Sequence, residues 1–383
     1  MAIFAVGGYY LRSRQSGTNT PPLQEGQTGS LPPGQAADGQ NSSQQDANGS
    51  GLTIASQSRA LDYFVDASKN VFVIQPDGQV IKSSDGRDEK ISEGPIAGIT
   101  GASFSFDGKK IMATIGGGSQ VKIEIFDVEQ KIWRLLPNIA QSPVWSPYNH
   151  QLAFLSKVGD STALYTLNAD DPKAKPVEAT RIRQQDMVLD WVSRSKILLG
   201  DAPNSQWASS LWVFDTAKKT VSPVLLDKNG LQTTWDSSQT TGFAFYSNEN
   251  SYTGGQAWLI GQDGKRIQRM NLLTLPSKCV FYDKPISSAT STTASEKTTL
   301  LLFCAVPRDK QAFENKPLPD AYLEKDLFTS DDLFEIEVFS GNLENIFGSS
   351  KIGVDADNLK VFGNSLFFTN RFDGKVYYVN LPA

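Results

Sequence analysis

Short apolar segments alternate with polar turns along the chain from residue 52 to its end. One mark recurs: an aromatic residue is followed by a polar turn and then by an apolar run, as in "WSPYNHQLAF". The aromatic residues of this mark are spaced 41, 46, 44 and 46 positions apart, and they are Phe104, Trp145, Trp191, Trp235 and Phe281. A repeat of this length, made of short strands, predicts a radially or linearly repeated all-β fold.

A second mark, a strand of alternating apolar and polar residues that ends at a turn, recurs along the chain together with the first. Its seven members end at Ile74, Phe126, Leu167, Phe214, Ile260, Ile336 and Val379. Within residues 100–137 the pattern gives four strands joined by turn-like connections. The two marks together predict a seven-bladed β-propeller of four-stranded antiparallel blades over residues 52–383. A count of six or eight blades stays open, because the turns of blades four and five depart from the common pattern.

The ring of a propeller must be closed, because an unpaired sheet edge invites aggregation. The chain ends on "KVYYVNLPA", which we interpret as the third strand of the last blade. The early strand at 51–56 is therefore expected to be the missing outer strand of that blade. It fits the inner strand of blade one equally well, and the sequence does not separate the two.

The first fifty residues differ in composition from the rest. Residues 1–14 begin with an uncharged apolar run and end in "RSR", and residues 15–51 are rich in Gln, Gly, Ser, Asn and Pro without any aromatic residue. Eleven apolar residues rise only ~16 Å as a helix, against a hydrocarbon core of ~30 Å. We expect 1–14 to be the remnant of a membrane anchor or signal anchor, with a frayed apolar tail as the alternative, and 15–51 to be a flexible, disordered linker.

Charge excludes one class of partner. The chain has 41 Asp+Glu against 36 Lys+Arg and no dense run of basic residues. It lacks the basic footprint that binding to a phosphate backbone needs. Nucleic acid is therefore not expected as a partner.

The segments "FSFDGKKIMA" and "WSPYNHQLAF" resemble the aromatic-Ser-Pro-Asp-Gly repeats of TolB-type and WD-like bacterial propellers, over residues 52–383. The blade around "KCVFYD" is similar to one in membrane-anchored bacterial propellers of unassigned function. The resemblance implies a rigid binding platform, monomeric and anchored to a membrane. It favours an extracytoplasmic propeller, with a cytoplasmic-facing one left open by Arg12 and Arg14.

The familiar catalytic motifs are missing from the chain. The one histidine, His150, aligns with Lys109 in a turn and is expected to be exposed to solvent rather than to act as a base. The chain contains no Gly-x-Ser-x-Gly elbow, no HExxH pair and no phosphate-binding loop ahead of a helix. The pair Asp331 and Asp332 is more typical of a turn that enters a strand. We therefore expect no catalytic residue, no cofactor and no metal site.

The two cysteines flank a predicted hairpin. Cys279 lies two residues before Phe281, and Cys304 ends the apolar strand "LLLFC". If Phe281 lies opposite Phe303 or Leu302, the antiparallel register places the two sulfurs across from each other. We expect a disulfide between Cys279 and Cys304, with two buried free thiols as the alternative.

Unusual connections gather on one face of the predicted ring. Because strands alternate in direction, the second-to-third connections and the blade-to-blade connections emerge on the same side. In blades four to six these connections carry aromatic side chains, which we take as a candidate binding face: Trp207, Tyr252, Phe313, Tyr322 and Phe328. The alternative is that the insert 306–332 folds over its own blade and buries its aromatic residues.

The function expected from the sequence is that of a binding or scaffold propeller, not an enzyme. It would recognise an unidentified protein or cell-envelope ligand through the face of blades four to six while tethered to a membrane. Two alternatives are kept. One is a hydrolase or lyase that processes glycans or peptides with carboxylates at the mouth of the channel, and the other is a structural module of an envelope assembly.

Overall fold

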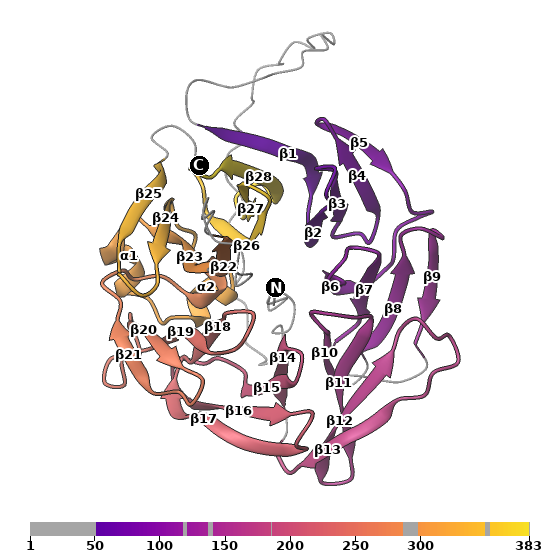
Figure 1. Ribbon diagram of the computed structural model, residues 1–383, viewed down its shortest axis with the longest axis horizontal. Coiled ribbons are helices and arrows are strands. Elements are labelled where there is room, and N and C mark those ends of the chain that lie inside the picture. Colours follow the sequence, from indigo (N-terminus) through magenta and orange to yellow (C-terminus); the bar gives the residue numbers. More distant parts are fainter. Residues whose placement is uncertain are drawn as a thin grey trace, which may run out of the picture.

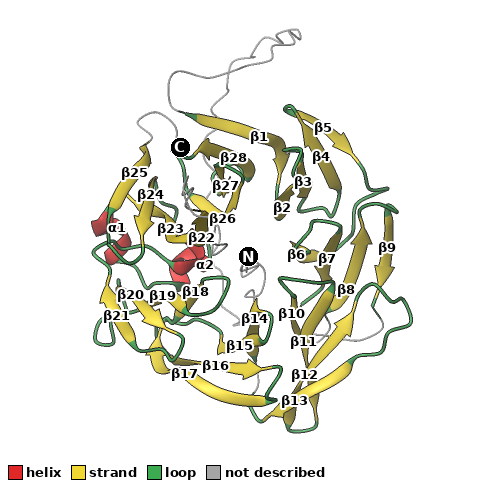
Figure 2. Cartoon of the chain, in the orientation of Figure 1, coloured by secondary structure: helices red, strands yellow, loops and turns green. Residues whose placement is uncertain are grey.

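Seven four-stranded antiparallel sheets are arranged in a ring about a central axis (Figures 1 and 2). This is a computed structural model, and it describes residues 51–117, 121–136, 141–184, 186–285, 298–348 and 353–382. The predicted fold is confirmed, including the count of seven blades. The proposed anchor and almost all of the proposed linker lie outside the described residues.

Blades one to six use their strands in chain order from the axis outward. Blade one contains β2 (Asp62–Val65), β3 (Val71–Ile74), β4 (Val80–Ser84) and β5 (Arg87–Lys90). Blade two contains β6 (Ile99–Phe104), β7 (Lys110–Ile115), β8 (Lys122–Asp127) and β9 (Ile132–Leu135). Blade three contains β10 (Gln141–Trp145), β11 (Gln151–Val158), β12 (Ser161–Asn168) and β13 (Val177–Ile182).

The next three blades repeat this plan. Blade four contains β14 (Met187–Ser193), β15 (Lys196–Asp201), β16 (Ala208–Asp215) and β17 (Thr220–Asn229). Blade five contains β18 (Gln232–Trp235), β19 (Thr241–Tyr246), β20 (Gln256–Gly261) and β21 (Arg266–Arg269). Blade six contains β22 (Cys279–Pro285), preceded by the 3-10 turn η1 (Pro276–Lys278), then β23 (Thr298–Pro307), β24 (Asp331–Glu337) and β25 (Leu343–Gly348).

Blade seven closes the ring with strands from both ends of the described chain. It contains β26 (Ala356–Phe362), β27 (Ser365–Asn370) and β28 (Lys375–Asn380), and its outer strand is β1 (Leu52–Arg59). In the pairing of β1 with β28, Leu52 lies opposite Val379. The early strand is therefore the outer strand of the last blade, which settles the alternative that the sequence left open.

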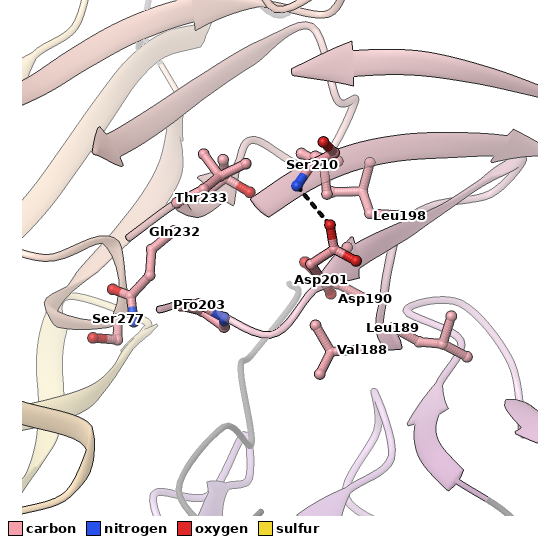
Figure 3. A pocket seen from close by; sticks show the side chains of 13 residues that line it. Val188, Leu189, Asp190, Leu198, Asp201, Pro203, Ser210, Gln232, Thr233 and Ser277 are labelled. Carbon is pink, nitrogen blue, oxygen red and sulfur yellow. Dashed lines mark hydrogen bonds between the residues drawn. The ribbon is translucent and has the colours of Figure 1, made fainter. Parts of the chain in front are cut away.

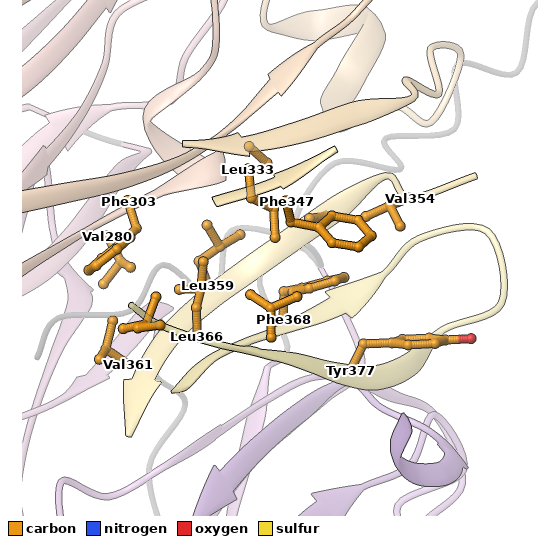
Figure 4. Packing of buried hydrophobic residues seen from close by; sticks show 14 of the residues in the cluster. Val280, Phe303, Leu333, Phe347, Val354, Leu359, Val361, Leu366, Phe368 and Tyr377 are labelled. Atoms are coloured by element: carbon orange, nitrogen blue, oxygen red, sulfur yellow. The ribbon is translucent and has the colours of Figure 1, made fainter. Parts of the chain in front are cut away.

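The hydrophobic core lies between neighbouring blades. Side chains of a strand alternate between its two faces, so each inner strand packs on the blade before it and the blade after it. Between blades six and seven, Val280, Phe303 and Leu333 pack against Leu359 and Phe368 (Figure 4). The recurring aromatic residues serve this packing, with Trp145, Trp191 and Trp235 all less than a tenth exposed.

The predicted disulfide is present in blade six. Cys279 lies opposite Cys304 and Phe281 opposite Leu302 in the β22–β23 register, and the two sulfurs are bonded. Disulfides persist in oxidising, extracytoplasmic environments. Over the part of the chain described, no helix is both long enough and apolar enough to cross a membrane.

The double variant Cys279→Ala/Cys304→Ala is expected to lower the free energy of unfolding by about 3.5 kcal/mol. The bridge joins residues 25 positions apart, and opening that loop increases the entropy of the unfolded chain. Urea denaturation with and without a reductant measures the effect. The reductant should leave the double variant unchanged, and a loss below about 1 kcal/mol in the wild type would contradict the expectation.

Candidate functional site

Three connections that carry the aromatic residues of the candidate binding face emerge on one face of the ring, which we call the loop-rich face. It carries the connection 202–207 of blade four, the connection 247–255 of blade five and the insert 308–330 of blade six. Of the aromatic residues predicted on this face, Trp207 is 71 % exposed, and Tyr252 and Phe328 are both 45 % exposed. These three are placed on the surface, and their part in binding stays a prediction.

The apolar side chains of the blade-six insert pack against blade five and the connection that follows it. The insert contains the short helices α1 (Lys310–Glu314) and α2 (Asp320–Leu323). Phe313 and Tyr322 are buried, in a cluster that includes Phe245 of β19. The expectation that these two rings are exposed contact residues is therefore wrong, because they anchor the insert to the ring.

Hydrogen bonds extend the insert as far as blade four. Asp320 accepts a bond of 2.7 Å from the hydroxyl of Ser205 and a bond of 3.1 Å from its backbone N–H. On blade five, the hydroxyl of Ser247 donates to the carbonyl of Leu318. The insert thus bonds to the loops of blades four and five across the loop-rich face.

Asp320→Ala is expected to loosen the 202–207 connection without unfolding the ring. The variant loses the charge-assisted bonds to Ser205, which are worth about 2 kcal/mol together. Hydrogen exchange of the Ser205 amide should accelerate roughly 30-fold if local opening controls it. Asp326→Ala, at an exposed position of the same insert, is the control and should leave that amide unchanged. Equal exchange in both variants would contradict the linking role.

A buried ion network lies beneath the insert. The ammonium of Lys278 lies 2.8 Å from Asp331 and 2.6 Å from Asp355, and all three side chains are fully buried. Thr329 and Tyr322 also accept bonds from this ammonium. Burial alone would lower the pKa of Lys278, but the negative field of the carboxylates outweighs it and raises the pKa. The network joins η1, β24 and the start of blade seven, so it is a structural clamp.

A pocket lies on the same side of the ring, where blades four, five and six meet (Figure 3). Its volume is about 50 Å³, enough for a few water molecules or a small aliphatic group. Apolar side chains form most of the wall, with a few polar groups between them. The lining residues are Val188, Leu189, Asp190, Leu198, Gly200, Asp201, Pro203, Ser210, Leu211, Leu231, Gln232, Thr233 and Ser277.

Asp190, in the wall of the pocket, has a strongly raised pKa. It lies on the inner strand β14 and shares a face with Val188 and Val192, toward blade five. The residue is 8 % exposed, and among the described residues its Oδ2 atom has no hydrogen-bond partner. Burial raises the pKa of Asp190 from 3.8 to about 7. A buried carboxyl without a partner is costly, and such groups concentrate at functional sites.

A second carboxyl in the pocket has a different environment. Asp201, at the end of β15, accepts a bond of 2.8 Å from the backbone N–H of Ser210 and another from the amide of Gln184. Across the pocket, Gln232 and Ser277 each have a buried oxygen atom without a partner in the described part of the chain (Figure 3). Asp190, whose Oδ2 atom has no partner among the described residues, and Asp201, which is hydrogen-bonded, make up a pair of the kind that acid–base chemistry uses.

The one histidine is not exposed as expected. The side chain of His150 is 14 % exposed and lies between two carboxylates, 3.0 Å from Asp107 and 2.8 Å from Asp170. Burial raises the pKa of Asp107, but the hydrogen bond with His150 outweighs it and lowers that pKa overall. Because these contacts join the turns of blades two and three, the residue connects two blades.

Asp190 was not among the residues predicted from the sequence, although a signal was present. The residue directly before the recurring aromatic is Ser103, Val144, Thr234 or Val280 in blades two, three, five and six, and it is Asp190 in blade four. A charged residue at an inner-strand position that is otherwise small or apolar is informative, because Asp is rarely buried without a partner. The close pair Asp331 and Asp332, by contrast, is split between the buried network and a surface ion pair with Arg308.

No protein-family model and no curated protein matches the chain. Solved structures share the fold. The tricorn protease is 11 % identical, with 88 % of this chain and 34 % of that chain covered and a TM-score of 0.50. The acylaminoacyl peptidase of Pyrococcus horikoshii is 11 % identical, with coverages of 72 % and 43 % and a TM-score of 0.45. Oligogalacturonate lyase in complex with manganese is 12 % identical, with coverages of 86 % and 96 % and a TM-score of 0.38.

These similarities correct two expectations drawn from the sequence. The chain was expected to be a non-catalytic scaffold and not an enzyme, but a protease shares its fold. These two expectations are therefore not kept. The chain spans about a third of the tricorn protease, and at this identity the likeness establishes the fold alone. An activity has to be argued from the pocket itself.

Proposed function

We propose that this propeller is a hydrolase or lyase that processes peptides or glycans, with Asp190 as its proton-transfer group. The observation that carries the proposal is a buried carboxyl in the wall of a pocket, with a pKa of about 7 and an Oδ2 atom that has no hydrogen-bond partner among the described residues. A group with this pKa is populated in both protonation states near neutral pH. It can therefore donate a proton to a leaving group or accept one from water or carbon.

The surroundings of Asp190 support this role. Apolar neighbours such as Leu198 and Leu211 keep the carboxyl desolvated, which strengthens its interaction with a substrate atom. Asp201 is held in place by its hydrogen bonds and offers a second carboxyl in the same pocket. Hydrolysis and elimination both require the transfer of a proton at a defined position. The two carboxyls differ in environment, as is needed for one to act as an acid and the other as a base.

The test is turnover by the purified chain on two panels, one of quenched-fluorescence peptides and one of labelled oligosaccharides. Wild type should process members of one panel at pH 7, and Asp190→Asn should lower the rate by about 10²–10⁴-fold, the range of general acid–base catalysis. Asp263→Asn, in an exposed turn of blade five, is the control and should keep the wild-type rate. No turnover on either panel, or equal turnover by Asp190→Asn, would refute the proposal.

The cellular setting is a separate part of the proposal. Residues 1–14 tether the propeller to a membrane through the linker 15–51, with the propeller on the extracytoplasmic side and related to TolB-type propellers. The apolar run before Arg12 and the disulfide support this placement. Membrane fractionation of the full chain, beside a chain that lacks residues 1–14, tests it. Recovery of both chains in the soluble fraction would contradict it.

A further inference from the structure

Access to the pocket depends on a short connection of blade four. We infer that the connection 202–207 is a lid that must move before a substrate reaches Asp190, and that Asp320 of the insert is the latch that holds this lid closed. The inference rests on the proposed function, since it concerns the same pocket, and it adds a gate to that site. Its grounds are the burial of the carboxyl, the bonding of the pocket wall and the contacts of the connection.

The structure shows the pocket in a closed arrangement. Asp190 is 8 % exposed, and its Oδ2 atom is buried. The cavity of about 50 Å³ holds a few water molecules or one small group, and it is far smaller than the pockets that enclose small-molecule ligands. An amino-acid residue or a sugar ring therefore reaches the carboxyl only if a part of the wall is displaced. Enzymes commonly achieve this by the movement of a loop.

Most of the wall is fixed by the sheets and by the buried ion network. Val188, Leu198 and Leu211 lie on β14, β15 and β16, and their positions belong to the paired register of these strands. Ser277 lies in η1, directly before Lys278, whose buried ammonium is the centre of the ion network. A displacement of these segments would break several backbone hydrogen bonds or buried ion pairs, so they form a rigid part of the wall.

The connection 202–207 is held in a different way. The register between β15 and β16 ends at the pair Gly200 and Leu211, so the connection lies beyond the paired strands. Pro203 of this connection lines the pocket (Figure 3), and Trp207 is 71 % exposed on the loop-rich face. Movement of the connection away from the ring opens the pocket toward this face and leaves the register of β15 and β16 intact.

Asp320 supplies the charged hydrogen bonds that hold the connection in place. Its carboxylate accepts a bond of 2.7 Å from the hydroxyl of Ser205 and one of 3.1 Å from the Ser205 N–H. Two further bonds are neutral, from the Gly230 N–H to the carbonyl of Asn204 and from the Asn229 amide to the carbonyl of Ser205. Hydrogen bonds to a charged acceptor are about twice as strong as neutral ones. The bonds to Asp320 are therefore the main barrier to opening of the lid.

The latch itself is part of a fixed segment. Phe313 and Tyr322, on either side of Asp320 in the insert, are buried in the cluster that contains Phe245 of blade five. The insert therefore stays on the ring when the bonds to Ser205 break. Because one side of the contact is fixed and the other is a short connection, the opening is local.

The experiment measures access to the pocket with a thiol placed in its wall. The two native cysteines are bonded to each other, so Leu198→Cys gives the chain a single free thiol. Leu198 is 1 % exposed, and iodoacetamide should label the new thiol only when the lid opens. Asp320→Ala in this background should accelerate labelling roughly 30-fold, the factor expected for exchange of the Ser205 amide, because both report the same opening. Asp326→Ala is the control and should leave the labelling rate unchanged.

Two further measurements keep the experiment decisive. The labelling rate should change little with urea below the unfolding transition, because local opening exposes little surface whereas global unfolding exposes much. Leu211→Cys, on the neighbouring strand β16, places a thiol at another point of the wall and should show the same dependence on Asp320. It replaces Leu198→Cys if that variant does not fold.

The outcomes separate the inference from the proposed function. If Asp320→Ala accelerates exchange of the Ser205 amide but not labelling, the connection moves without opening the pocket, and the inference is overturned. It is also overturned if the thiol of Leu198→Cys is labelled as fast in the folded chain as in urea. Both results leave the proposed function intact. Labelling that depends on Asp320, together with equal turnover by wild type and Asp190→Asn, supports the lid and refutes the proposed function alone.

Discussion

Asp190→Asn is expected to make the protein more stable at pH 8 while it removes the activity. In the folded state the pKa of Asp190 is about 7, against an ordinary value of 3.8. The folded protein therefore holds a proton that the unfolded chain releases, and folding stability falls as the pH rises between these two values. The difference of about three pKa units corresponds to a cost on the order of 4 kcal/mol at pH 8. An uncharged asparagine does not incur this cost.

The measurement is urea denaturation of wild type and Asp190→Asn at pH 8 and at pH 4. The variant should be more stable at pH 8, and the gain should shrink toward zero at pH 4, where Asp190 is protonated in the folded state. Asp263→Asn controls for the loss of one exposed negative charge. A variant that is less stable than wild type at pH 8 would show that the fold stabilises the Asp190 carboxylate instead of its protonated form. A gain in stability together with a loss of turnover is typical of active-site residues.

Lys278→Met is expected to lower the free energy of unfolding by about 3–5 kcal/mol. The substitution leaves Asp331 and Asp355 buried without their shared ammonium, although Arg371 still contacts Asp355 at 3.0 Å. Desolvation already raises the pKa of Asp331 in spite of the attraction of Lys278. Loss of the ammonium should raise that pKa further, so that the variant takes up a proton on folding.

Urea denaturation measures this effect, and a second substitution tests its cause. Lys278→Met/Asp331→Asn removes the carboxylate that is left unpaired and should recover part of the lost stability. Lys284→Met, on β22 of the same blade, is the control and should change the stability by less than about 0.5 kcal/mol. Equal stability of wild type and Lys278→Met would contradict a stabilising role for the buried ion network. If the double variant recovers no stability, the loss comes from changed packing and not from the unpaired carboxylate.

Local pattern was sufficient to predict most of the fold. The spacing of the aromatic residues gave the blades, and the register between Phe281 and the facing strand gave the disulfide. Strand alternation and turn chemistry act over a few residues, so one sequence displays them directly. The sequence did not predict how the strand Leu52–Arg59 closes the ring, because it fitted both the outer strand of blade seven and the inner strand of blade one. The structure pairs it with β28.

The pocket and the buried clamp could not be predicted in the same way. Lys278, Asp331 and Asp355 are separated by more than twenty residues at each step, and only the ring brings them together. The insert was expected to present its aromatic residues to a partner, with a fold over its own blade as the alternative, but its apolar residues pack against blade five. The length of the insert alone does not predict which blade it packs against. The sequence marks Asp190 as a charged residue on an inner strand. Whether its carboxyl is buried away from polar groups depends on the side chains that face it from blade five.

The pH dependence of turnover by wild type and Asp190→Asn, on whichever substrate class the chain processes faster, tests the central claim most directly. Wild type should show a limb in its rate profile with a midpoint near 7, set by the pKa of Asp190. Asp190→Asn should lack that limb and be at least about 100-fold slower at pH 7. The same limb and the same rate in Asp190→Asn would show that the proton-transfer group is not in this pocket.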